Sequence, residues 1–266
     1  MQDNFLELPG ATAICASLQS NDYITWLDLS RNRIGLRCGD VFSRLLQENR
    51  TITHLDLSGN QLGDNAGAQI IEALNDNHSL TAVNLSDNEL GEKSAKALGT
   101  LLYHSENLLS LDFSWNNLRG EGGKAIGPGL RDNHALTSLN LSYNALDSAA
   151  GAAIGESLTA NTSLVSLNLR RNKICGAAAA AALAQAVSTN LSLKTLDLSD
   201  NPLTLAEATL IASAVCQLTR SLHVDMEHVT VNWAEVQGVP GWYACGVAIV
   251  GLRLISCTSS SSLYLF

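Results

Sequence analysis

Residues 108–118 read Leu-Leu-Ser-Leu-Asp-Phe-Ser-Trp-Asn-Asn-Leu, and variants of this stretch recur along the 266-residue chain. The other copies begin at Ile24, Ile52, Leu80, Leu136, Leu164 and Leu193. Each copy holds one marker asparagine, and these are Asn32, Asn60, Asn88, Asn116, Asn144, Asn172 and Asn201. The spacing between markers is 28 residues five times and then 29. A period this regular predicts stacked, equivalent structural units.

Each unit is expected to contain one strand and one helix. Around each marker the pattern L-x-L-x-x-N alternates with period two, which is typical of a short β-strand. The stretch that follows, for example 66–74, has apolar residues at helical spacing. Strands that always return through a helix pair in parallel, and wide helices make the sheet the inner wall. We predict an α/β solenoid, a curved horseshoe with a parallel β-sheet on the concave face and α-helices on the convex face.

The marker asparagines are interpreted as a structural ladder. Each lies where a strand turns away from the sheet, and a buried amide there is expected to satisfy backbone groups of the neighbouring repeat. A second column falls near the expected helix ends and comprises Asn21, Asn49, Asn77, Asn133, Asn161 and Asn190. Because asparagine tolerates left-handed backbone, we expect these residues to close the helices in that conformation.

The pattern L-x-x-L-x-L-x-x-N-x-(L/I), followed by a helix of this length, resembles a leucine-rich repeat of the ribonuclease-inhibitor-like subclass. The resemblance covers roughly residues 10–234. More narrowly, the segments 111–117, 129–133 and 155–158 are similar to the leucine-rich repeat-containing protein 74 group. The resemblance implies the solenoid fold. The functions that it implies range from inhibitors and immune-receptor sensors to Ran GTPase-activating proteins and scaffolds, because function depends on the sites that a fold carries.

We divide the chain into two parts. Residues 1–234 form the leucine-rich repeat array, with a partial first repeat, seven regular repeats of about 28 residues and a degenerate closing strand near 221–231. The helical half of a repeat at 10–18 has no recognisable strand before it, so we expect the sequence to begin inside a longer array. Residues 235–266 do not continue the repeat and are interpreted as a disordered tail or an artefact of the gene model. The apolar stretch 242–257 is shorter than the roughly 20 residues that span a bilayer, which disfavours a membrane anchor.

The charge balance and the cysteine content limit the classes of partner and the cellular compartment that we expect. Sixteen basic against 25 acidic residues give a net charge of −9, which provides no general attraction for nucleic acid or anionic membrane. The chain opens without a secretory signal pattern, and its six cysteines show neither C-x-x-C spacing nor the density of a disulfide scaffold. We therefore expect a cytoplasmic protein that does not bind nucleic acid.

We predict no catalytic, cofactor or metal site. The phosphate-binding pattern G-x-x-x-x-G-K-[ST] is absent, and 91–94 resembles only its end. One strand alternates a histidine, a carboxylate and a hydroxyl, at His54, Asp56 and Ser58. Side chains two residues apart on a strand lie about 6.6 Å from one another, which is too far for the hydrogen-bonded relay of a nucleophile. His223 and His228 are expected on opposite faces, so they should not share a metal ion.

The sheet presents columns of equivalent side chains, about 4.8 Å apart from repeat to repeat. The position between the two leucines forms an acidic and amide stripe of Asp28, Asp56, Asn84, Asp112, Asn140, Asn168 and Asp197. It is interpreted either as an ordinary solvated face or as an anionic strip that meets a basic partner. A calcium site there is disfavoured, because carboxylates in a flat row do not converge on an ion.

The position just before each marker asparagine is far more variable and reads Arg31, Gly59, Asp87, Trp115, Tyr143, Arg171 and Asp200. We interpret this variability as the absence of a structural requirement, which leaves the position free to carry specificity. Trp115, Tyr143 and Arg171 should lie side by side, and these residue types dominate binding hot spots. Arg170 and Lys173 join Arg171 in a predicted basic spot on the acidic wall. The alternative is ordinary surface variation.

Trp26, at the start of another column, is a weaker binding candidate. We predict a non-enzymatic protein-interaction module or scaffold that binds a protein partner through its concave sheet. Two alternatives stay open. A GTPase activator of the Ran type would need a loop that stabilises the γ-phosphate transition state, and its expected acidic C-terminal stretch is missing here. The sensor end of a nucleotide-binding leucine-rich repeat receptor would need a phosphate-binding loop before residue 1.

Overall fold

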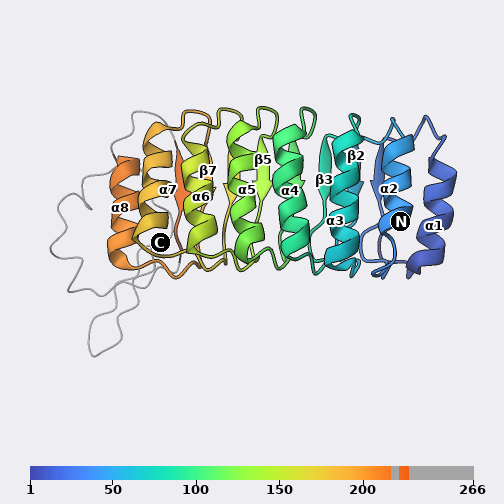
Figure 1. Cartoon of the computed structure of the whole chain (residues 1–266), viewed down its shortest axis with the longest axis horizontal. Helices are drawn as coiled ribbons and strands as arrows, with labels where there is room; N and C mark the ends of the chain where they lie inside the picture. Colours follow the sequence, from blue (N-terminus) through green and yellow to red (C-terminus); the bar gives the residue numbers. More distant parts are fainter. Residues whose placement is uncertain (217–221, 228–266) are drawn as a thin grey trace, which may run out of the picture.

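The computed structural model describes residues 1–216 and 222–227, in which helices and strands alternate (Figure 1). The strands are β1 Trp26–Asp28, β2 His54–Asp56, β3 Ala82–Asn84, β4 Ser110–Asp112, β5 Ser138–Asn140, β6 Ser166–Asn168, β7 Thr195–Asp197 and β8 His223–Asp225. The helices are α1 Glu7–Leu18, α2 Gly39–Glu48, α3 Gly63–Ala73, α4 Glu92–His104, α5 Gly120–Asp132, α6 Ser148–Leu158, α7 Ala177–Thr189 and α8 Leu205–Cys216. A short 3-10 helix, η1 Leu74–Asp76, follows α3 directly.

The described strands form one open parallel sheet in which they follow chain order from β1 to β8. Each residue pairs with the residue one repeat later, as Trp26 does with His54 and Asp28 with Asp56. Figure 1 shows the helices in a row along one side of the sheet. Because a helix is wider than the strand spacing, the sheet is the inner face of such a stack. The predicted α/β solenoid with a parallel sheet and a helix layer is confirmed.

The core lies between the sheet and the helices. In the fourth repeat Leu108, Leu111 and Phe113 point inward and are at most 2% exposed. The equivalent positions of the other regular repeats are buried as well, apart from Ile24. Burying one such side chain contributes about 1.5–3 kcal/mol. Because every repeat packs on its neighbours in the same way, the stack shares one continuous core.

The marker asparagines bond backbone groups of two repeats at once. Six of the seven are buried, and Asn116 is partly buried. At Asn60 the side-chain Nδ2 donates to the carbonyl oxygens of Leu57 in its own repeat (2.8 Å) and Leu29 in the preceding one (2.9 Å). The Asn60 Oδ1 accepts the backbone N–H of Asn32 at 2.9 Å. One amide therefore joins consecutive strand ends.

The ladder of marker positions extends to Asn4, one repeat before Asn32. The backbone N–H of Asn4 donates to Asn32 Oδ1 at 2.9 Å, as Asn32 does to the next marker. Asp3, just before it, has a φ of 58°, close to the 56° of Arg31. Only the helical half of this first repeat is predicted from the sequence. The missed signal is the motif Asp-Asn-Phe-Leu at 3–6, which is in register with the marker column.

The second asparagine column does not adopt the predicted left-handed conformation. Asn49, which follows α2, has φ −76° and ψ 131°, and Asn133 and Asn190 are extended in the same way. The side chain closes the helix end instead. Asn49 Nδ2 donates to the carbonyl oxygen of Leu18 at the end of α1 (2.7 Å), and its Oδ1 accepts the N–H of Ile52 at 2.9 Å. Because the amide bonds across repeats, the backbone can leave the helix extended and enter the next strand.

Some predictions concern residues outside the described ranges. They include the tail 235–266, its apolar stretch 242–257 and His228. The division of the chain into an array and a tail therefore stays a prediction. Across the described residues, every helix is too short or too polar to cross a bilayer.

Candidate interaction surface

The rim column, which we define as the seven residues just before the marker asparagines, lies where the strands turn away from the sheet. It consists of Arg31, Gly59, Asp87, Trp115, Tyr143, Arg171 and Asp200. Every member has a positive φ, from 52° at Arg171 to 67° at Gly59. The prediction that this position carries no structural requirement is therefore wrong. The backbone is fixed in the left-handed region, and only the side chain varies.

The left-handed region is least costly for glycine, asparagine and aspartate. Gly59, Asp87 and Asp200 follow this preference, whereas Trp115 and Tyr143 do not. For a residue with a Cβ the conformation costs roughly 1–2 kcal/mol. Two aromatic residues thus occur where the backbone favours them least, and residues strained in this way cluster at functional sites.

The structure brings Trp115, Tyr143 and Arg171 together in one stack. The Trp115 and Tyr143 rings lie 3.8 Å apart between centroids, with 14° between their planes. The guanidinium carbon of Arg171 lies 5.3 Å from the centroid of the Tyr143 ring. Trp115 is 57% exposed despite the stacking. The three residues form a continuous surface of two rings and a cation, which we call the aromatic stack.

The predicted basic spot is an ion-pair cluster. Arg170 Nε donates to Asp200 Oδ2 at 2.9 Å, and its Nη2 lies 3.5 Å from a Glu227 carboxylate oxygen. Burial alone would lower the pKa of Arg170, but the hydrogen bond to Asp200 and the nearby carboxylates raise it. Arg171 Nε lies 3.4 Å from the same Asp200 oxygen. Lys173 is exposed, and no ion pair joins it to the rest of the described chain. Much of the positive charge is therefore balanced within the protein.

Trp26 lies apart from the aromatic stack, at the first strand of the sheet. It stacks on His54 with centroids 4.6 Å apart and planes 9° apart, and it is 66% exposed. His54 Nδ1 is 2.8 Å from Thr53 Oγ1. The structure thus separates the sequence-predicted candidates into two aromatic pairs, one at β1 and β2 and one at the ends of β4 and β5.

The acidic and amide stripe is bonded within the protein. Asp56 Oδ1 accepts the N–H of Ser58 at 2.8 Å, and its Oδ2 accepts the Asn84 amide at 2.9 Å. The same turn recurs at Asp28, where burial alone would raise the carboxyl pKa but the hydrogen bonds from Ser30 lower it. These side chains close the strand ends, so the stripe has a structural role in addition to its charge.

The distance predicted between Asp56 and Ser58 is wrong. The Ser58 hydroxyl donates to Asp56 Oδ1 at 2.6 Å, because Ser58 lies beyond β2 in a turn that folds its side chain back. His54 bonds to Thr53 instead. The same aspartate and serine pair recurs at Asp112 and Ser114, also at 2.6 Å, which identifies it as a turn motif of the repeat.

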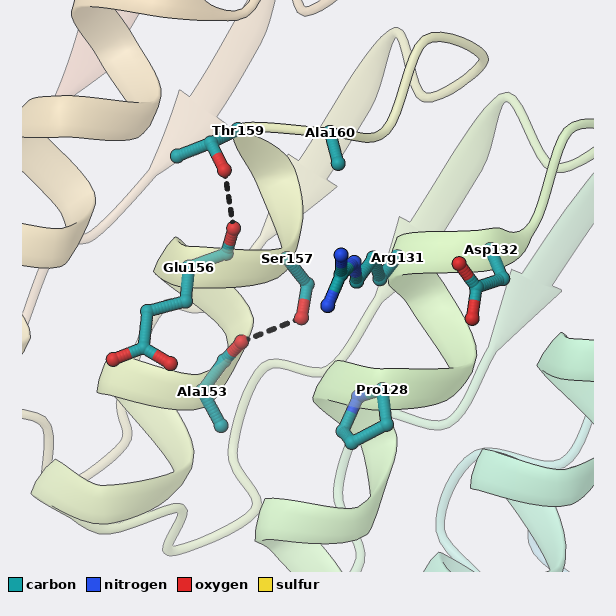
Figure 2. Close-up of a pocket in the computed structure, with 8 residues that line it drawn as sticks. All are labelled: Pro128, Arg131, Asp132, Ala153, Glu156, Ser157, Thr159 and Ala160. Carbon is teal, nitrogen blue, oxygen red and sulfur yellow. Dashed lines mark hydrogen bonds between the residues drawn. The ribbon is translucent and has the colours of Figure 1, made fainter.

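On the helix side, the described residues include two grooves that the sequence patterns did not indicate. One, of about 410 Å³, lies between α5 and α6 (Figure 2). It is lined by Pro128, Arg131, Asp132, Ala153, Glu156, Ser157, Thr159 and Ala160. The Ser157 and Thr159 hydroxyls donate to carbonyl oxygens of their own helix region, both at 2.6 Å, so they are already used. A second groove, of about 390 Å³, lies between α4 and α5.

Pro128 lines both grooves, whereas Gly127 and Gly129 beside it pack directly against the backbones of α6 and α4. The sequence offers no clear signal for either groove. The charges at the first groove are mixed, with one arginine against two carboxylates. Metal ligands are not assembled here or elsewhere in the described ranges, where no three His, Cys, Asp or Glu side chains form a group able to hold an ion. The aromatic stack is therefore the stronger candidate site.

Comparisons with known proteins agree with this architecture. The sequence model of the family described as Leucine Rich repeat matches residues 48–70, 76–99, 104–127, 132–155, 160–183 and 189–206, together more than half of the chain. A comparison with the curated proteins finds no match. The chain is similar to the solved structure of the leucine-rich repeat-containing protein LegL7 from Legionella pneumophila, with 23% identity and a TM-score of 0.53 over 90% of this chain and 84% of that one.

The solved structure of leiomodin-1 actin-binding site 2 is 20% identical, with a TM-score of 0.46 over 55% of this chain and 86% of that one. The likeness to LegL7 indicates a shared fold, in agreement with the parallel sheet and the regular repeat. The period of 28 residues, the bonded marker asparagines and the family match lead to one assignment. The chain belongs to the leucine-rich repeat family.

Proposed function

We propose that this protein is a non-enzymatic scaffold that binds a protein partner on the concave face of its sheet, through the aromatic stack. The observation that carries the proposal is the exposed Trp115 ring stacked on the half-buried Tyr143 ring, both on left-handed backbone. Tryptophan, tyrosine and arginine are the residue types that dominate binding energy at protein interfaces. A ring that is already stacked loses little conformational entropy when a partner docks on it.

The surroundings of the aromatic stack support rigid docking. The marker asparagines tie each strand end to the next, so the rim column is held by a bonded ladder rather than by a loose loop. A partner would contact a strip of roughly 30 Å, the length of seven strands at their usual spacing. Pre-organised surfaces of this kind bind with small backbone changes.

The other predicted contact residues have different parts in the proposal. Lys173 and Trp26 are exposed and would make peripheral contacts with a large partner. Arg170 is committed to Asp200 and Glu227, so it would act by positioning Asp200 beside Arg171. Because the proposal depends on the two rings, losing either ring should matter more than losing Arg170.

We also propose that the repeats are of the ribonuclease-inhibitor-like subclass, with the leucine-rich repeat-containing protein 74 group as the nearest resemblance. A period of 28 or 29 residues and helices of 10 to 13 residues support this subclass. A cytoplasmic location is supported by the free thiols of Cys15, Cys38 and Cys175. Burial raises the pKa of Cys15 to about 12 and that of Cys38 to about 11, so both are expected to be unreactive.

The proposal is tested by affinity capture with the full chain and three matched variants. Trp115→Ala/Tyr143→Ala removes both rings of the stack. Tyr103→Ala removes an aromatic side chain of similar exposure on α4, on the helix side. Trp26→Ala tests the second aromatic pair. Circular dichroism first establishes that all variants fold.

A partner that wild type and Tyr103→Ala retain, and that the double variant loses, would support the proposal. Retention by the double variant with loss by Tyr103→Ala would move the binding surface to the helix side and overturn it. Loss by Trp26→Ala alone would move the surface to β1 and β2, which also contradicts the assignment to the aromatic stack.

A further inference from the structure

The aromatic stack has two unlike ends. At one end Arg171 lies over the Tyr143 ring, 5.3 Å from its centroid, with its Nε 3.4 Å from Asp200. A cation is thus held between an aromatic face and a carboxylate. This arrangement combines cation–π attraction with an ion pair. At the other end of the stack lies Trp115.

The outer face of Trp115 is open. One face of its ring is covered by Tyr143, and the side chain is still 57% exposed. The next member of the rim column is Asp87, whose Oδ2 lies 3.7 Å from the point where a Cβ on Gly59 would be. Because this is less than the repeat spacing of about 4.8 Å, the carboxylate leans toward Gly59 and away from the ring. Space therefore remains beside the open face, with a carboxylate at its edge.

The charge around this space is negative. Asp87 and Glu89 are exposed, and Asp56 and Asp112 lie on the stripe beside them. Fifteen positions of the second, third and fourth repeats lie on the sheet side. They are 54, 56, 58, 59, 61, 82, 84, 86, 87, 89, 110, 112, 114, 115 and 117. These positions hold the four carboxylates and neither lysine nor arginine. The nearest cation of the rim is Arg31, whose Cγ lies 3.0 Å from the same Cβ point over Gly59. No ion pair joins it to Asp87 in the described residues.

We infer that the open face of Trp115, together with Asp87 and Glu89, is a seat for one arginine or lysine side chain of the partner protein. The seat would repeat, with a partner's cation, the arrangement that Arg171 makes with Tyr143 and Asp200 at the other end of the stack. Charge complementarity selects this occupant, because an acidic or neutral side chain would gain nothing from the two carboxylates. The inference rests on the proposed function and adds the charge class of the residue that the partner presents.

The test uses the full chain and three capped tripeptides, Gly-Arg-Gly, Gly-citrulline-Gly and Gly-Glu-Gly. Citrulline keeps the shape of arginine and lacks its charge. Binding is followed by the nuclear magnetic resonance signal of the Trp115 indole N–H, identified as the signal missing from Trp115→Phe. The arginine peptide should bind about three-fold more tightly than the citrulline peptide, as expected for one cation–π contact at an exposed site. The glutamate peptide should leave the signal unchanged.

Variants locate the seat. Asp87→Asn/Glu89→Gln should reduce the preference for arginine over citrulline, because only the contact with the Trp115 ring then remains. Glu72→Gln/Asp76→Asn removes the same charge from exposed residues on the helix side and should leave the preference intact. Arg31→Gln removes the cation that reaches toward Asp87 and should tighten arginine binding.

The outcomes separate this inference from the proposed function. Equal binding of the arginine and citrulline peptides, or no effect of Asp87→Asn/Glu89→Gln, would overturn the cation seat. The proposed function would still stand if the partner were lost by Trp115→Ala/Tyr143→Ala. A partner held by that double variant would overturn the proposed function, whatever the peptides do.

Discussion

Residues 115 and 116 are adjacent in the chain but belong to two columns that behave in opposite ways. The marker column holds asparagine in all seven regular repeats, and each amide bonds backbone groups of neighbouring repeats. The rim column holds five residue types in the same seven repeats, on backbone that is left-handed throughout. In both columns the fold fixes the backbone. Only in the marker column does it also fix the side chain.

The reason lies in what each side chain must do. A marker side chain has to donate hydrogen bonds to two carbonyl oxygens and accept one from a backbone N–H, all at a fixed distance from its own backbone. An asparagine amide can do this, whereas a carboxylate has no hydrogen to donate. A rim side chain meets no such demand, because the backbone groups of that residue pair along the sheet, as Trp115 N–H does with the Ser142 carbonyl oxygen at 3.0 Å. The contrast teaches that variation in the rim column can follow binding without loss of the fold.

The largest expected effect contrasts Asn144→Ala with Tyr143→Ala. Removing the Asn144 amide leaves the carbonyl oxygens of Phe113 and Leu141 and the N–H of Leu118 without that partner. The Phe113 and Leu141 oxygens keep the amides of Asn116 and Asn172. The loss of these three hydrogen bonds, at about 1 kcal/mol each, should still lower the free energy of unfolding by about 3 kcal/mol. Tyr143→Ala should cost about 1 kcal/mol, the value of one aromatic pair.

Urea unfolding followed by circular dichroism measures both variants at one temperature and one salt concentration. Equal losses of stability at positions 143 and 144 would break the contrast, because they would give the rim side chain a structural role. A loss at Asn144 confined to the neighbouring repeats, seen by hydrogen exchange, would still agree with it, since solenoid repeats stabilise one another through their nearest neighbours.

The second prediction concerns the backbone of the rim column itself. Trp115→Gly and Trp115→Val both remove the ring, so neither keeps the stacking with Tyr143. Glycine adopts a φ of +57° without strain, whereas a β-branched side chain does not. Trp115→Gly should therefore be more stable than Trp115→Val by about 1–2 kcal/mol.

Thermal and urea unfolding of the two position-115 variants check this difference. Equal stabilities would mean that the backbone at position 115 is not held in the left-handed region, which would remove the strain argument for the aromatic stack. Trp115→Phe serves as the control, because it keeps both the backbone strain and an aromatic ring.

Much of the fold could be predicted from the sequence, because the solenoid depends on spacing. A strict period places equivalent residues side by side, so the parallel sheet and the order of Trp115, Tyr143 and Arg171 along the rim both follow from the register. Turn geometry was harder to predict. The left-handed rim and the hydrogen bond between Asp56 and Ser58 arise beyond the strand ends, where strand periodicity no longer applies.

The electrostatics of the site could not be predicted from the sequence pattern. Arg170, Arg171 and Lys173 read as a basic spot, but two of them share Asp200, about one repeat later in the chain. Such pairing depends on which way each long side chain bends, and the repeat does not encode that direction. The grooves beside α5 were missed for a different reason: they lie between neighbouring helices, and their width depends on how those helices pack, which the repeat pattern does not give.

The third prediction contrasts two carboxylates: Asp64, which bonds backbone groups of the next repeat, and Asp87, a member of the rim column. Asp64 of α3 accepts the N–H groups of Gly91 and Ser94 at 2.8 Å and that of Lys93 at 3.1 Å, at the start of α4. Burial alone would raise the pKa of Asp64, but these hydrogen bonds lower it. Asp64→Asn loses one acceptor of that set and should lower the free energy of unfolding by about 1 kcal/mol at pH 7.

The lowered pKa of Asp64 determines how the stability difference between wild type and Asp64→Asn changes with pH. A carboxyl whose pKa is lower in the folded protein stabilises it above the unfolded pKa of about 3.9, and the stability is lost as the pH falls through the folded pKa. The difference between wild type and Asp64→Asn should therefore be full at pH 7 and shrink below about pH 4. Asp87→Asn, in the rim column, should change the unfolding free energy little at any pH. A pH-independent effect of Asp64→Asn would contradict the capping role.

The smallest expected effect is at Arg170, where the other regular repeats have serine. Arg170→Ser breaks the contacts with Asp200 and Glu227, but Asp200 keeps Arg171 within 3.4 Å. Pairs this near the surface contribute about 0–1 kcal/mol, so stability should fall by less than about 1 kcal/mol and by less still at high salt. The aromatic stack should keep its geometry in Arg170→Ser. Asp200 then pairs with Arg171 alone, and Arg171 should stay over Tyr143. If Arg170→Ser destabilised the chain as much as Asn144→Ala, position 170 would behave like a marker position, and the separation between structural and binding columns would fail at this repeat.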